Sequence, residues 1–135
     1  MSTQAHQGNK AQKLQWIGDS GKILTVGTSE YNERQYAVFD IRGDINTPLT
    51  MKKLDNNNAQ MQTHYDSDTG MLYVVNKGQA LTQFFHLTDD GGAPELTALD
   101  KYAGKENQLF VYFMPKKYVN FMECEVQRGL RISAK

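Results

Sequence analysis

Few residues of this chain have the type and spacing that metal chemistry needs. The segment Asp66-Ser-Asp-Thr-Gly70 matches the first half of a calcium loop, but a full loop needs a Glu about six residues after its glycine. That position holds Asn76. His6, His64 and His86 are far apart, with none at zinc-ligand spacing and no second cysteine to help them. The sequence therefore predicts no metal site.

Nucleophilic catalysis is equally unsupported. Ser20 and Ser29 have no adjacent base and do not lie on a strand-to-helix turn. The single cysteine, Cys124, has no basic neighbour that would lower its pKa, and the alternating segment Met122–Val126 around it predicts a thiol packed on a strand. We expect no enzyme activity, no catalytic residues and no cofactor.

Composition restricts the classes of partner. Fifteen basic and fifteen acidic residues among 135 give a formal net charge of zero, which does not favour nucleic acid or an anionic membrane surface. No run of about 18 apolar residues is present, so membrane insertion is not expected. Residues 1–12 form a polar segment without the apolar core of a signal peptide. These features predict a cytoplasmic protein.

The apolar residues alternate or come in short runs, and turn residues return every eight to twelve positions, which predicts an all-β fold. Asp19–Gly21 and Asp66–Gly70 are predicted hairpin turns in which glycine supplies a positive φ. Pro48 and Pro94 precede predicted outer strands, where the lost backbone donor matters least.

A pattern of four short strands occurs twice, about 46 to 49 residues apart, and begins a third time. This spacing is typical of the blades of a β-propeller, each of which must stack on a neighbour. We predict a partial WD40-type propeller of about two and a half four-stranded antiparallel blades. Its parts are a blade at 13–54, a blade at 59–102 and an incomplete blade at 107–135, in which Val119–Val126 is a predicted strand.

A closed ring needs about four to eight blades, so faces and strand edges are expected to stay uncovered. The chain could pair with further blades on another chain, assemble with itself, or be a piece of a longer protein. Aromatic residues within the strands are predicted to be core, and Trp16 is expected to be buried against the next blade. The full set is Trp16, Tyr36, Phe39, Tyr73, Phe84, Phe110, Tyr112 and Phe121.

The wording of the blades resembles the late blades of coronins, WD-repeat proteins that bind and remodel actin filaments. The resemblance runs from the end of the fifth through most of the seventh coronin blade and covers nearly everything from His6 to Ile132. Its most specific part is the Glu33-Arg-Gln and Met114-Pro-Lys wording, which ordinary WD repeats lack. The matching segments are Ser20–Gly27, Glu33–Asp40, Tyr65–Gly70, Tyr73–Gly78, Phe84–Thr88, Phe113–Lys117 and Cys124–Arg128.

The resemblance implies a non-catalytic module in actin-filament binding and cytoskeleton organisation, with F-actin or actin-associated proteins as partners. The early-blade arginine that the family uses on actin has no counterpart here, so a contact must come from late-blade loops. Strand alternation places Arg34, Lys77 and Lys105 on one rim with Asp55, and Lys116 and Lys117 on the opposite rim. The first three are the predicted contacts, as exposed cations. The alternative is a structural piece that assembles with another blade-bearing chain or itself, without binding actin.

Overall fold

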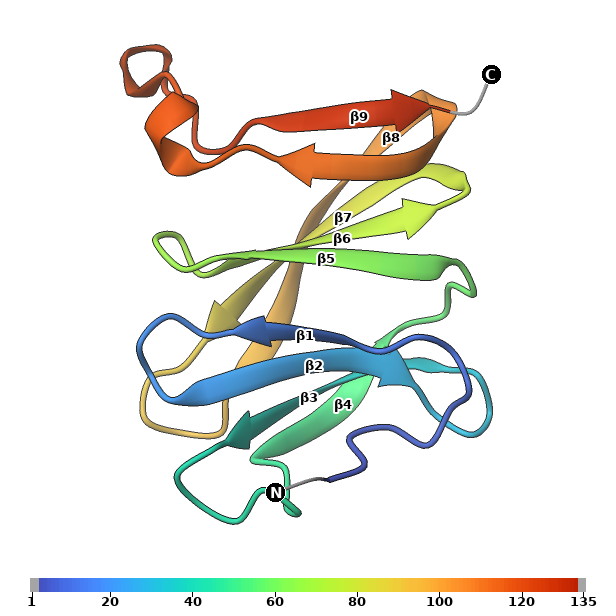
Figure 1. Cartoon of the computed structure of the whole chain (residues 1–135), viewed down its shortest axis with the longest axis vertical. Helices are drawn as coiled ribbons and strands as arrows, with labels where there is room; N and C mark the ends of the chain where they lie inside the picture. Colours follow the sequence, from blue (N-terminus) through green and yellow to red (C-terminus); the bar gives the residue numbers. More distant parts are fainter. Residues whose placement is uncertain (1–2, 134–135) are drawn as a thin grey trace.

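The strands of this computed structural model, which describes residues 3–133, form two antiparallel sheets (Figure 1). The first sheet has the order β1-β2-β3-β4 and the second β5-β6-β7-β8-β9. The prediction of an all-β partial propeller is confirmed. The strands of the first sheet are β1 (Lys13–Trp16), β2 (Lys22–Thr28), β3 (Arg34–Asp40) and β4 (Thr50–Asp55). Those of the second are β5 (Gln60–Asp66), β6 (Met71–Lys77), β7 (Gln79–Thr88), β8 (Glu95–Phe113) and β9 (Gly129–Ser133).

Both predicted hairpin turns are present. Gly21 has φ 73° between β1 and β2, and Gly70 has φ 67° between β5 and β6. Because a side chain is strained at such angles, glycine allows each chain reversal to be tight. The following strands then pair in register, Lys22 opposite Asp40 and Met71 opposite His86.

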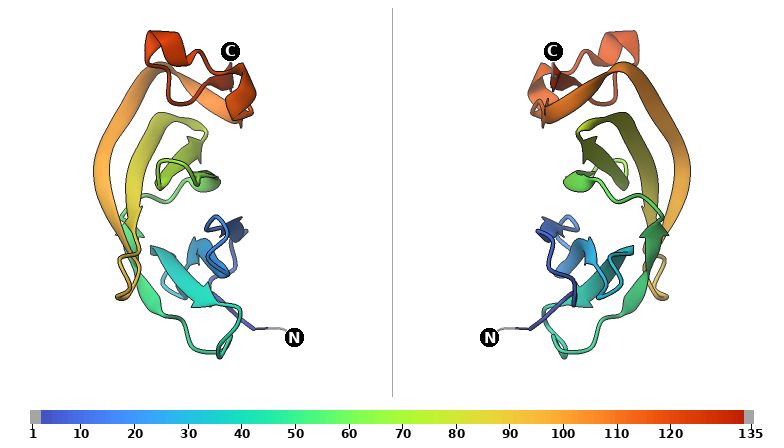
Figure 2. Two further views of the ribbon diagram at one scale, coloured as in Figure 1. Left: turned by 90° about the vertical axis from the view of Figure 1, so that its left-hand side faces the viewer. Right: turned by 90° about the vertical axis from the view of Figure 1, so that its right-hand side faces the viewer.

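Strand β8 belongs to two layers. Its first part, residues 95–103, pairs with β7, and its last part, residues 108–113, pairs with β9. Figure 2 shows this long strand, in orange, bending around the edge of the stack. We call β1–β4 blade 1, and β5–β7 with residues 95–103 blade 2. Residues 108–133 are the half-blade.

The prediction of a strand at Val119–Val126 is wrong. Two short 3-10 helices, η1 (Lys116–Tyr118) and η2 (Phe121–Glu123), lie in the loop before β9. Asn120 accepts a hydrogen bond from the Met122 amide, and Glu125 accepts one from the Asn120 amide, 2.7 Å away. Such local side-chain bonds compete with strand pairing. Cys124 is therefore exposed, with φ 56°, and is not the packed thiol that the alternation predicted.

The hydrophobic core lies between the two sheets. Leu24, Leu72 and Val74 have no exposed surface, although they come from different blades. Stacking of sheets buries the apolar face of each, which is the main stabilising contribution in such a layered fold. The core consists of Ile17, Leu24, Val26, Tyr36, Val38, Met61, Leu72, Val74, Phe85 and Leu87.

The prediction that Trp16 is buried against the next blade is wrong. Gln15 faces blade 2 and donates to the Thr63 carbonyl at 3.1 Å. Because side chains alternate across a strand, Leu14 and Trp16 point to the opposite face. They are 54% and 57% exposed.

Part of that outer face is covered by the polar N-terminal segment, of which residues 1–2 lie outside the described range. His6 is 1% exposed, and its ring nitrogens lie 3.0 Å from Thr25 Oγ1 and from Gln35 Nε2. The ring packs on Gly27, where a Cβ would approach it to 2.6 Å. Burial lowers the pKa of His6. Within residues 3–133, no helix has the length and apolar character needed to cross a membrane.

Candidate functional surface

Arg34, one of the three predicted contact residues, is not an exposed cation. Its side chain is 1% exposed and lies between the blades. Arg34 Nε is 3.1 Å from Asp55 Oδ1, and Arg34 Nη1 donates to Asn76 Oδ1 at 2.7 Å. Arg34 Nη2 reaches Gln83 Oε1 at 3.4 Å. The predicted exposure was wrong because rim assignment fixes the end of a strand but not the face on which its side chain lies.

Burial is the main influence on Arg34. It lowers the pKa of the guanidinium, while the nearby Asp55 carboxylate partly offsets this. Because a buried charge needs a full set of partners, Asp55, Asn76 and Gln83 together make the position tolerable. Arg34 thus joins blade 1 to blade 2.

Lys77 and Lys105 do lie together at one edge of the second sheet. Lys77 ends β6, and the next residue, Gly78, donates to the Gln108 carbonyl at 2.8 Å. Lys105 lies in the bend of β8, between the residues paired with Gln79 and Leu81. Both lysines are exposed, and neither forms an ion pair with any residue in the 3–133 range.

Lys116 and Lys117 lie beyond the opposite end of β6. Lys116 Nζ is 2.6 Å from Asp66 Oδ2 and also donates to the Val126 carbonyl at 2.9 Å. Lys117 is exposed, with its ammonium 4.9 Å from the centre of the Tyr118 ring. Only Lys117 is a solvated turn residue, because Lys116 links the half-blade to blade 2.

Two titratable groups beside this link have shifted pKa values. Burial alone would raise the pKa of Asp66, but hydrogen bonds from Lys116 and Thr69 bring it below its ordinary value. Burial lowers the pKa of His64, whose ring stacks on Phe113 with 4.4 Å between centroids. Both groups are held in one protonation state by structure rather than poised for proton transfer.

The exposed apolar residues form a surface that the sequence reasoning missed. Phe110 pairs with Ile132, and Tyr112 with Leu130, across β8 and β9. All four lie on one face of the half-blade and are 46% to 60% exposed. Phe121 and Met122 at the loop tip are 69% and 93% exposed. The cross-strand register could not be read from sequence, because the predicted strand before β9 does not form.

The prediction of aromatic core residues is therefore divided. Tyr36, Phe39 and Tyr73 are buried, whereas Trp16, Phe110, Tyr112 and Phe121 are exposed. Phe84 packs edge-on to Tyr73 at 5.6 Å between ring centroids. The exposed rings lie on the faces that have no neighbouring sheet within the described structure.

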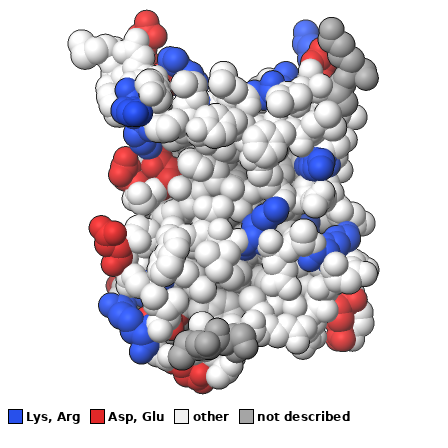
Figure 3. All heavy atoms as spheres, in the orientation of Figure 1, with Lys and Arg blue, Asp and Glu red and all other residues white. Residues whose placement is uncertain are grey.

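Charge and metal-ligating groups do not form a site. Lys, Arg, Asp and Glu are dispersed on the face in Figure 3, with no single patch of one sign. Within residues 3–133, no three His, Cys, Asp or Glu side chains are placed to hold a metal ion. The arrangement is suited to contacts with another macromolecule.

Comparison with known proteins identifies the relatives of this fold. No family model matches the chain. Coronin-2A of Mus musculus is 33% identical over 128 residues, and coronin-A of Dictyostelium discoideum is 31% identical over 128 residues. Each match covers 95% of this chain but only 24% and 28%, respectively, of the relative. The chain therefore spans about a quarter of the length of these proteins.

A solved structure shows the same similarity. The WD40 domain of Toxoplasma gondii coronin superposes with a TM-score of 0.84 and 30% sequence identity. The match covers 96% of this chain and 33% of the domain's chain. The resemblance to coronins is confirmed in sequence and in fold, over one part of their WD-repeat domain.

Proposed function

We propose that this chain, a homologue of part of the coronin WD-repeat domain, is a non-catalytic module that binds actin filaments and helps to organise the cytoskeleton. The single observation that supports this is the match to coronins over 95% of the chain. Its place of action would be the cytoplasm, at the actin cytoskeleton. F-actin or an actin-associated protein would be the partner.

The contact would use Lys77 and Lys105, which are exposed on one edge of the second sheet. Arg34 would act indirectly, by holding the two blades in place. Exposed cations contribute about 1 kcal/mol or less each, and salt screens them. Two such contacts support binding in the high-micromolar to millimolar range only.

Co-sedimentation with filamentous actin at low and at physiological salt tests this function. We expect weak, salt-sensitive binding that the double variant Lys77→Ala/Lys105→Ala abolishes. Lys117→Ala, a solvated cation at the opposite rim, is the matched control and should leave binding unchanged. Tight binding that persists at high salt would show that a different surface carries the contact.

A second candidate function is assembly through the blade faces, without actin. Leu14 and Trp16 at one end and Phe110, Tyr112, Leu130 and Ile132 at the other expose large apolar side chains. Exposed apolar faces of this kind mark interaction sites. Self-association or pairing with another blade-bearing chain would bury them.

Size-exclusion chromatography with light scattering separates the two candidates. Assembly predicts a mass above 15.3 kDa that falls when Tyr112 and Leu130 are both changed to Ser. A compact monomer of 15.3 kDa at all concentrations, with cooperative unfolding, would contradict assembly and leave the actin function standing.

A further inference from the structure

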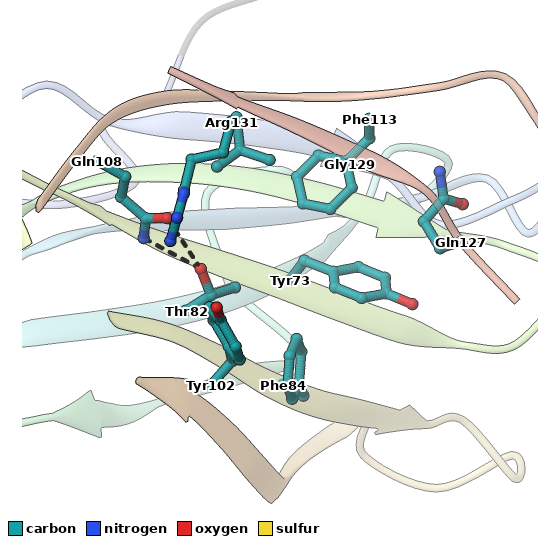
Figure 4. A pocket seen from close by; sticks show the side chains of 10 residues that line it. Tyr73, Thr82, Phe84, Tyr102, Gln108, Phe113, Gln127, Gly129 and Arg131 are labelled. Carbon is teal, nitrogen blue, oxygen red and sulfur yellow. Dashed lines mark hydrogen bonds between the residues drawn. The ribbon is translucent and has the colours of Figure 1, made fainter. Parts of the chain in front are cut away.

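A cavity of about 490 Å³ lies between blade 2 and the half-blade (Figure 4). Tyr73, Phe84 and Tyr102 line it with aromatic rings, and Arg131 reaches into it from β9. Gln108 lies at the same end as Arg131 and donates to Thr82 Oγ1 at 3.0 Å. The volume is within the range of pockets that hold ligands in proteins.

The cavity exists because two core positions have changed residue type. Gln15 bridges to Thr63, 48 residues away, and Gln62 bridges to Val111, 49 residues away, so these bonds relate the inner strands of successive blades. In blade 2, Thr63 pairs with Val74 and Tyr65 with Leu72, and both partners are fully buried. In the half-blade, Val111 pairs with Arg131 and Phe113 with Gly129.

Arg131 and Gly129 therefore stand where Val74 and Leu72 stand in blade 2. The glycine leaves empty the space that a leucine side chain fills one blade earlier. The arginine brings a positive charge to the same face. Among residues 3–133, Arg131 has no carboxylate within ion-pair distance.

The strand that carries both residues has an unpaired edge. In the two blades, β2 lies between β1 and β3, and β6 lies between β5 and β7. Within the described strands, β9 has a neighbour on one side only, β8. The other side presents free backbone N–H and C=O groups, the arrangement that accepts an added strand.

Blade 2 shows how an added strand would be read. Its third strand, β7, is antiparallel to β6 and places Gln83 opposite Val74 and Phe85 opposite Leu72. A strand added antiparallel to β9 would likewise meet Arg131 first and Gly129 two residues later. Directly opposite residues share a face, so both of its side chains would enter the cavity.

We propose that the free edge of β9 binds an extended peptide of the pattern acidic-x-aromatic. The acidic side chain pairs with Arg131 across the strands. The aromatic side chain lies over Gly129 and fills the space beside Tyr73 and Phe84. An aromatic residue opposite a strand glycine covers the backbone that the glycine leaves bare. This binding site is separate from Lys77 and Lys105 and does not depend on the proposed actin function.

The test uses a fluorescein-labelled, end-blocked peptide of sequence TETFTK and fluorescence anisotropy with the whole chain. The peptide TFTETK, with the two key residues exchanged, is the matched ligand control. We expect saturable binding of TETFTK and at least tenfold weaker binding of TFTETK. Equal binding of both peptides, or none of TETFTK, would overturn the proposal.

Variants of the chain locate the site. Arg131→Glu should weaken TETFTK binding by about tenfold or more, equivalent to about 1.4 kcal/mol. It should improve binding of TKTFTK, because the charges are then reversed. Gly129→Leu should fill the cavity as Leu72 does in blade 2 and weaken TETFTK to a similar extent.

Folding is checked separately for each variant. Arg131 is exposed, so Arg131→Glu should keep the wild-type circular dichroism spectrum and urea midpoint. If Arg131→Glu folds and still binds TETFTK as the wild type does, the peptide lies elsewhere and the proposal is wrong. If the chain associates with itself through β9 and TETFTK does not compete, a second copy is the occupant and the peptide motif is rejected.

Discussion

The interface between blades 1 and 2 and the interface between blade 2 and the half-blade use the same strand geometry with opposite results. At the first, apolar residues from both sheets meet with Leu72 and Val74 fully buried, and Arg34 spans the gap. At the second, Gly129 and Arg131 leave a cavity of about 490 Å³. Blade spacing alone therefore does not produce a closed interface, because the side chains at two positions and the presence of a third strand decide it.

The closed interface should depend most on its buried ion pair. Arg34→Ala leaves Asp55 partly buried without its cation and removes the bonds to Asn76 and Gln83. We expect a loss of about 3 to 5 kcal/mol in the free energy of unfolding. Urea denaturation at one low protein concentration measures it. A loss below about 1 kcal/mol would mean that Arg34 is held by the interface without contributing to it.

Cavity formation in the same interface should cost slightly less. Leu72→Ala removes a fully buried side chain between the sheets and should cost about 2 to 5 kcal/mol. Leu130→Ala, on the exposed face of the half-blade, is the matched control and should cost about 0.5 kcal/mol or less. Equal losses at both positions, again by urea denaturation, would remove the distinction between the two interfaces.

The link between the half-blade and blade 2 should appear in the pH dependence of stability. The folded pKa of Asp66 is lowered, so its contribution is present above the unfolded value of about 3.9 and is lost as pH falls through the folded pKa. In Lys116→Met, burial of Asp66 is no longer offset by the lysine, and its folded pKa should rise.

Acid unfolding monitored by circular dichroism measures this effect. The Lys116→Met variant should begin to unfold at a higher pH than the wild type and lose about 1.5 to 3 kcal/mol near neutral pH. Lys117→Met is the control, since Lys117 contacts only Tyr118 among the residues that the structure describes. An unchanged acid transition in Lys116→Met would show that the half-blade is not held through Asp66.

The smallest effect is expected at Trp16, on the outer face of blade 1. Because it is 57% exposed, Trp16→Ala should change the free energy of unfolding by about 0.5 kcal/mol or less in dilute protein. The single tryptophan should emit at the wavelength of a solvated indole. A blue shift as protein concentration rises would show that this face is covered by a second copy. A blue-shifted spectrum in dilute protein would contradict the exposed position.

The repeat in the sequence was sufficient to predict the architecture. Its spacing, the glycines at Gly21 and Gly70 and the alternation within each strand predicted two blades and an unfinished third, as observed. These signals are local, because turn geometry and strand periodicity depend on neighbouring residues. The resemblance to coronins rested on the same segments.

Only the tertiary structure decided which face of each strand is covered. Alternation shows that Trp16 and Gln15 point to opposite sides but does not say which side meets blade 2. Arg34 has the sequence of a rim cation, yet the stacking of the sheets closes over it. The same holds for Gly129 and Arg131, whose cavity arises from strand pairing between residues far apart in the chain. Burial depends on what lies opposite, and a single strand does not carry that information.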